Sequence, residues 1–117
     1  MANNYDLEER TAKYGEEIIR FCKSVKSTPI SRPLINQLVR SGTSVGANYM
    51  EANAASSKKD FRNKIHIAKK EAQETKHWLR MIAECEPERK DDIRTLWKET
   101  QELTFIFGKI LSSINKK

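Results

Sequence analysis

Six polar or basic residues recur at steps of four and three residues in the second half of this chain. They are Arg62, His66, Lys69, Gln73, Lys76 and Arg80, and the series contains no acidic residue. On a helix, this spacing places all six side chains on one face. The row would extend about 27 Å at 1.5 Å per residue, and could follow several phosphates of a nucleic acid backbone. The alternative interpretation, and the more usual one for a charged row, is a solvated face that keeps the protein soluble.

The distribution of charge favours a polyanionic partner. The chain has a formal net charge of +6, and residues 58–85 hold eight basic and four acidic side chains, so four of the six excess charges lie there. A basic surface attracts nucleic acid through its phosphates without reading sequence. We therefore predict contacts with RNA or DNA through the row, with help from Lys58, Lys59 and Lys70.

Other arrangements capable of chemistry are weak in this chain. Glu74 and His77 have the Glu-x-x-His spacing of bundles that bind paired metals, but that design needs two inward-facing copies and the chain has one. The SGTSVG segment that begins at residue 41 lacks the lysine and the strand-then-helix context of a phosphate-binding loop. Cys22 and Cys85 lack CxxC spacing, so reduced thiols are expected. We expect no catalytic residues, no metal, no cofactor and no enzymatic activity.

Four long periodic segments would position the basic row. The expected helices span residues 6–26, 32–55, 58–85 and 88–115, and the prolines fall near the junctions. Ser31 and Ser57 stand where N-caps of the second and third helices are expected. Junctions this short force neighbouring helices to be antiparallel. We predict one domain, residues 1–117, with an all-α fold: an antiparallel up-down-up-down left-handed four-helix bundle.

Apolar residues at alternating steps of three and four define a core stripe in each expected helix. The stripes are Leu7, Thr11, Tyr14, Ile18, Phe21 and Val25 in the first helix, Phe61, Ile65, Ala68, Ala72, Thr75, Leu79 and Ile82 in the third, and Ile93, Leu96, Thr100, Leu103, Phe107, Ile110 and Ile114 in the fourth. In the second helix, Asn48 lies on the stripe, and we interpret it as a buried amide that fixes helix register.

The second helix presents two neighbouring faces of low charge and is rich in Gly, Ala, Ser and Thr. Gly42 and Gly46 would each destabilise a helix by roughly 1 kcal/mol relative to Ala, which indicates that something packs closely against them. Two such faces are too broad for one partner helix. We therefore expect one face to pack within the bundle and the other against a second copy of the chain.

Large apolar side chains outside the main core stripes strengthen the expectation of self-association. Several of them at helical spacing, two tryptophans included, indicate an interface. The predicted interface residues are Gly42, Gly46, Tyr49, Ile67, Trp78, Met81 and Trp97. The apolar set also supports a second hypothesis of function: an oligomeric scaffold that recruits a protein partner, with the charge serving solubility alone.

Residues 31–80 contain two motifs, RSGTSVGANYMEA and, after it, KxxFxxKxxIAxKEAxExxxWL. With them the chain resembles the bacterial four-helix-bundle proteins called 23S rRNA-intervening-sequence proteins, essentially over its whole length. The resemblance implies a small antiparallel bundle that assembles as a ring-like homopentamer. Similar proteins are accessory factors of diversity-generating retroelements, which implies association with a reverse transcriptase and nucleic acid. No molecular function is established for most of the family.

The N-terminal residues MANNYDLEER have no basic stretch followed by an apolar core, so a secretory signal is not expected. No segment is apolar for long enough to be a membrane span. We expect a cytoplasmic protein with no membrane partner.

Overall fold

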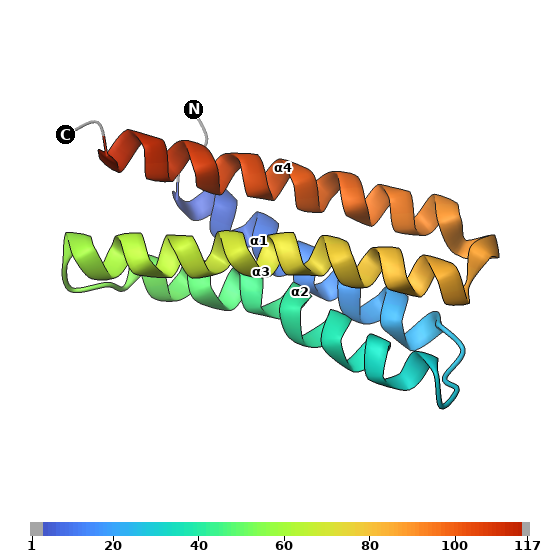
Figure 1. The fold of residues 1–117 in the computed structure, drawn as a ribbon. Helices are drawn as coiled ribbons and strands as arrows, with labels where there is room; N and C mark the ends of the chain where they lie inside the picture. The colour runs from blue at the N-terminus through green and yellow to red at the C-terminus, as the bar shows by residue number, and fades with distance from the viewer. Residues whose placement is uncertain (1–3, 116–117) are drawn as a thin grey trace.

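The computed structural model describes residues 4–115, and within this range the chain is almost entirely helical. The helices are α1 (Asn4–Ser24), α2 (Ser31–Asn53), α3 (Lys58–Cys85) and α4 (Lys90–Asn115). They lie side by side in an elongated molecule of 47 × 23 × 20 Å (Figure 1). The prediction of an all-α fold is confirmed, and the expected and observed helix bounds differ by at most two residues.

The start of α2 differs from the prediction. Ser31 is not the N-cap but the first residue of the helix, and Ile30 before it has helical backbone angles. Thr28 supplies the capping oxygen: its Oγ1 accepts hydrogen bonds from the backbone N–H groups of Ile30 and Ser31, at 3.2 and 3.0 Å. The hydroxyl of Ser31 donates instead to the carbonyl oxygen of Lys26, 2.7 Å away, and so ties the α1–α2 connection to the helix.

The starts of α3 and α4 follow from their first residues. Ser57 is the N-cap of α3 as predicted, because its Oγ accepts a hydrogen bond of 3.0 Å from the N–H of Asp60. A single 3-10 turn, Pro87–Arg89, precedes α4. Proline suits this position because the first N–H groups of a helix have no partner within the helix.

The helices enclose one core that is tight on three sides. α2 and α3 make the most extensive contact, α1 packs on α2 and α4 packs on α3, whereas α1 and α4 approach closely at only a few residues. The α1–α2 connection and the turn before α4 lie at one end of the molecule, and the α2–α3 connection lies at the other (Figure 1). The four-helix bundle is therefore loosest between its first and last helices.

The predicted core stripes of α1, α3 and α4 point inward. Every residue of the α1 stripe is buried, and so are those of α3 and α4 except Phe61, Ile110 and Ile114, which are half-buried. These three lie near the end of the bundle where α3 begins and α4 ends (Figure 1). Full burial of a leucine such as Leu79 or Leu103 contributes about 1.5–3 kcal/mol.

Candidate nucleic-acid interface

The six residues of the predicted row lie on one flank of α3, but only four of them line hollows between α3 and α4. These four are Lys69, Gln73, Lys76 and Arg80. His66 is exposed and lines neither hollow, and Arg62 is half-buried, with an Nε that has no hydrogen-bond partner among the described residues. The three accessory lysines, Lys58, Lys59 and Lys70, are exposed.

Helix α4 contributes further cations that the sequence analysis missed. Two hollows of about 470 and 440 Å³ adjoin along α3 and α4, and together we call them the α3–α4 groove. Its basic lining residues are Lys69, Lys76 and Lys109 in the first hollow and Arg80, Lys90, Arg94 and Lys98 in the second. None of the described residues that line either hollow is acidic. Lys90, Arg94 and Lys98 are spaced four apart, and this signal was available in the sequence.

Two of the four acidic residues of α3, Glu71 and Glu74, face α2 and are neutralised there. Arg40 of α2 lies 3.1 Å from Glu71 and also contacts Glu74. The indole N–H of Trp78 donates to Glu74 at 2.9 Å, and this bond together with Arg40 lowers the pKa of the Glu74 carboxyl. Because α3 keeps these carboxylates on its α2 side, they do not neutralise the groove.

Lys76 occupies the junction of the two hollows. Its Nζ donates a hydrogen bond of 2.5 Å to Gln101 Oε1 and lies 5.2 Å from the ring centroid of Trp97. A cation over an indole face is attracted by the ring electrons. These two contacts hold the ammonium group in the groove, and no described residue forms an ion pair with it.

Two residues predicted for a subunit interface, Gly42 and Tyr49, are buried inside the subunit, which corrects the prediction for them. A Cβ atom at Gly42 would lie 2.9 Å from Ile18 Cγ2, and one at Gly46 would lie 3.2 Å from Thr11 Oγ1, so α1 packs against both glycines. Gly46 is nevertheless only half-buried, because it also lines a hollow between α1 and α2. Tyr49 is 1% exposed, and its ring centroid lies 6.0 Å from that of Phe107. Both low-charge faces of α2 are therefore used within the bundle, one against α1 and one against α3.

The other four predicted interface residues are only partly covered. Ile67 and Trp97 are each 39% exposed, while Trp78 and Met81 are half-buried. Trp97 lines the α3–α4 groove, whereas Trp78 packs against the core and bonds to Glu74. The structure thus separates residues that the sequence analysis grouped together.

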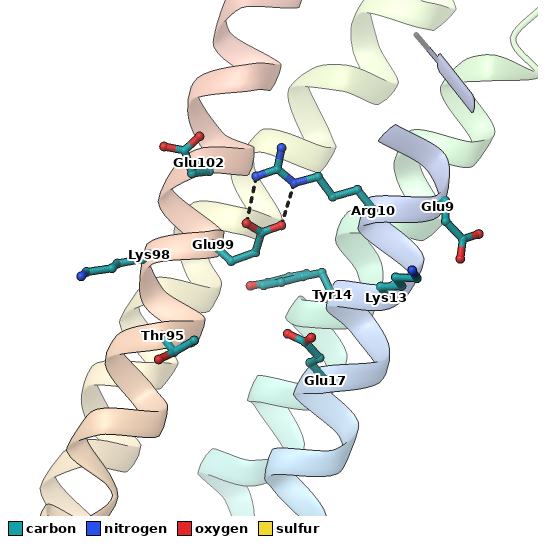
Figure 2. A pocket seen from close by; sticks show the side chains of 9 residues that line it. All are labelled: Glu9, Arg10, Lys13, Tyr14, Glu17, Thr95, Lys98, Glu99 and Glu102. Atoms are coloured by element: carbon teal, nitrogen blue, oxygen red, sulfur yellow. Dashed lines mark hydrogen bonds and ion pairs between the residues drawn. The ribbon is translucent and has the colours of Figure 1, made fainter. Parts of the chain in front are cut away.

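A third hollow, of about 680 Å³, lies between α1 and α4 and has a different character (Figure 2). Arg10 reaches across it and donates two hydrogen bonds to Glu99, from Nε at 2.8 Å and Nη2 at 2.9 Å. Its charged lining residues are four acidic and three basic ones: Glu9, Glu17, Glu99 and Glu102, and Arg10, Lys13 and Lys98. Figure 2 shows Lys98 pointing away from Arg10 and Tyr14. This hollow does not favour phosphate.

Beneath this ion pair, one hydroxyl from each helix is buried in a common layer. Tyr14 Oη lies 2.5 Å from Thr100 Oγ1, and Thr75 Oγ1 lies 2.8 Å from Ser41 Oγ. All four side chains are at most 2% exposed. Thr100 uses its single hydrogen for the carbonyl of Leu96, 2.7 Å away, so Tyr14 must be the donor of their bond. Burial raises the pKa of the Tyr14 phenol, although its hydrogen bonds with Thr100 and Thr75 oppose the shift.

Replacing Tyr14 with phenylalanine should weaken the fold by about 1 kcal/mol near neutral pH, because the donor to Thr100 is lost. The difference should shrink as the pH rises above about 10, where unfolded tyrosine ionises but buried Tyr14 keeps its proton, so the wild type loses stability that the variant does not. Urea unfolding of both proteins at neutral and alkaline pH measures this difference. A difference that stays constant or grows with pH would show that Tyr14 is not held in its neutral form.

Asn48, interpreted as a register-fixing amide, instead bonds to its own helix. Its Nδ2 donates to the carbonyl oxygen of Ser44 at 2.8 Å, and the side chain is only half-buried. The cross-helix polar contacts of the core come from the hydroxyl layer instead.

Within residues 4–115, no cluster of three or more His, Cys, Asp or Glu side chains could hold a metal ion. His77 is exposed and packs edge-on against Trp78, with ring centroids 4.9 Å apart. Both cysteines are free thiols. None of the described helices combines the length and apolar character needed to cross a membrane.

The fold and the groove together define an all-α, four-helix-bundle protein with a basic cleft between its last two helices. The family model for 23S rRNA-intervening sequence protein matches residues 3–109, and the chain belongs to that family. A crystal structure of a protein of unknown function from the S23 ribosomal protein family of Bacteroides thetaiotaomicron is similar to it. That structure has a TM-score of 0.85 and 28% sequence identity, over 93% of this chain and 97% of the other. No curated protein sequence matches the chain.

Proposed function

We propose that the protein is a non-enzymatic, oligomeric four-helix bundle that binds RNA or DNA through backbone phosphates in the α3–α4 groove. One observation carries the proposal: seven basic side chains and no acidic ones line the groove, whereas the α1–α4 hollow has four glutamates and three cations. Cations concentrated in a cleft attract a polyanion over distance and then pair with its phosphates.

The kinds of side chain in the groove favour binding without sequence readout. Five of the seven cations are lysines, which act as mobile point charges, whereas recognition of a guanine edge usually uses a fixed bidentate arginine. Arg80 is exposed, and Arg94 lies 3.4 Å from Asp91. We therefore propose that the groove follows the backbone of the nucleic acid and does not read its sequence.

A salt titration tests the proposal. If about four phosphates are neutralised per subunit, log affinity should fall with log salt concentration at a slope of roughly −3 to −4. Fluorescence anisotropy of labelled RNA and DNA oligonucleotides, with salt raised from about 50 to 200 mM, gives the slope. A slope near zero, or no binding at the lowest salt, would count against phosphate contacts.

We also propose that the protein self-associates as a homopentamer, the assembly implied by its resemblance to the family. Exposed Ile19 and Met50 flank an apolar hollow of about 290 Å³ between α1 and α2, and this surface supports contact with a second copy. The same surface could instead bind a protein partner such as a reverse transcriptase, which is the second candidate function. Light scattering decides the first point, because a species of 13.6 kDa at micromolar concentration would exclude the oligomer.

The order of the helices, the twist of the bundle and the location of the protein are also part of the proposal. The placement of successive connections at alternate ends of the molecule supports the antiparallel up-down-up-down order (Figure 1). We propose a left-handed twist for the bundle because its core stripes alternate at steps of three and four. We propose the cytoplasm as its location.

A further inference from the structure

Two aromatic rings stand exposed among the cations of the α3–α4 groove. Phe105 is 59% exposed and lines the hollow that contains Lys69, Lys76 and Lys109. Trp97 is 39% exposed and lines the adjoining hollow. Both belong to α4, eight residues apart, which corresponds to about 12 Å along a helix. Aromatic rings that alternate with cations in a groove are how proteins without sequence preference bind single-stranded nucleic acid.

The space beside Phe105 is open. Gly108 follows it by one helical turn, and a Cβ atom added at Gly108 would meet only Lys69 Nζ, 4.0 Å away. Thr104 and Ser112, both small and polar, line the same hollow together with the amides of Gln73 and Gln101. A flat base could therefore lie against the Phe105 ring, with hydroxyl and amide groups near its polar edge.

The second ring is already paired with a phosphate-binding cation. Lys76 Nζ lies over one face of the Trp97 ring, 5.2 Å from its centroid, and is held by Gln101, so a base stacked on the opposite face would lie close to a positive charge. A nucleotide offers both matching features, a base with a π face and a phosphate. In a duplex, the bases stack on one another and their faces are not available to a protein surface, whereas a single strand leaves them free.

We propose that the α3–α4 groove binds single-stranded RNA or DNA, with bases stacked on Phe105 and Trp97 and phosphates paired with Lys69 and Lys76. This inference rests on the proposed function and adds the class of substrate to it. A second copy of the chain is a poor occupant, because its own groove carries the same seven cations and none of the described lining residues is acidic. Like charges brought together across an interface repel.

The test compares Phe105→Leu, which keeps apolar bulk but removes the π face, with Phe105→Trp, which keeps the stacking surface. The probes are uridine and thymidine oligonucleotides of about 16 nucleotides and a duplex of equal length. Phe105→Leu should weaken single-strand affinity by about 5- to 100-fold, and Phe105→Trp should retain it. Duplex affinity and the salt slope should be the same in all three proteins, because no charge has changed. The uridine and thymidine arms show whether RNA or DNA is preferred.

Three results would overturn the inference. Equal single-strand affinity for Phe105→Leu and the wild type, with a steep salt slope in both, would remove base stacking and leave phosphate binding intact. Absence of binding to every probe at low salt would remove the proposed function as well. A lower mass for Phe105→Leu in light scattering, with an unchanged helical signal, would show that Phe105 contacts a second copy of the chain.

Discussion

Reversing three charges in the α3–α4 groove is expected to weaken nucleic-acid binding by roughly several hundred-fold at about 50 mM salt. The variant carries Lys69→Glu, Lys76→Glu and Arg80→Glu, which replace cations from both parts of the groove. Fewer counterions are released when phosphate contacts are lost, so the magnitude of the salt slope should also decrease by roughly 2 to 3. Fluorescence anisotropy of a labelled oligonucleotide over a salt series measures both quantities.

A control variant with the same change in net charge separates the groove from the overall charge. Lys23, Lys26 and Arg32 are all exposed and lie near the α1–α2 connection, outside the groove. Replacing these three by glutamate should reduce affinity only modestly, through the long-range field. Circular dichroism should show both variants to be helical. Equal losses in the two variants would mean that binding responds to net charge and that the groove is not the site.

Replacing Gly42 with leucine should destabilise the subunit by about 3 kcal/mol or more, because Ile18 of α1 leaves no space for a side chain at this position of α2. A Cβ atom there would approach three atoms of Ile18, at 2.9, 3.0 and 3.3 Å, and Ile18 is fully buried. Urea unfolding measures the loss. Adding Ile18→Ala should recover part of it, because the shortened side chain makes room for the new one.

Gly108→Ala is the matched control, since its Cβ atom meets nothing nearer than 4.0 Å. Alanine in place of glycine within a helix should stabilise the protein by about 0.5–1 kcal/mol. The mass of the protein discriminates between the two roles considered for Gly42. If Gly42→Leu leaves the stability of the subunit unchanged but lowers its mass in light scattering, the glycine packs against a second copy and not against α1.

Hydrophobic periodicity was sufficient to predict most of the core of this protein. Residues such as Tyr14, Ile65 and Leu103 lie at three- and four-residue steps, and that spacing places them on the inner face of a helix wherever the neighbouring helices are. The cap of α3 was equally predictable, because the contact between Ser57 and Asp60 is local in sequence. The cap of α2 was not, because Thr28 and Ser31 are both suitable residues and only the path of the connection selects Thr28.

Which helix packs against a face of small residues depends on the three-dimensional arrangement of the helices. Gly42 and Gly46 indicate close approach by another helix, but the spacing cannot tell α1 of the same chain from a helix of a second copy. Tyr49 is similar: it lies beside the main stripe of α2, and only the position of Phe107 on α4 shows that it is buried.

The part of the candidate site on α3 could be predicted from the sequence, and the part on α4 could not. The flank of α3 that includes Lys69 and Lys76 follows from one helix, so its spacing revealed it. The contributions of Lys90, Lys98 and Phe105 depend on which face of α4 borders that flank, and this requires the packing of two helices. The hydroxyl layer was missed for the same reason, because its members come from four different helices.

Lysine reactivity in the presence and absence of a bound oligonucleotide tests the location of the site most directly. The protein is labelled with an amine-reactive reagent at low salt, and the modification of each lysine is quantified by mass spectrometry. Binding in the α3–α4 groove predicts protection of Lys69, Lys76 and Lys109, while Lys13, Lys23 and Lys26, which are exposed on or next to α1, keep their reactivity. Protection that is uniform over the surface, or confined to the lysines of α1, would contradict the assignment of the groove.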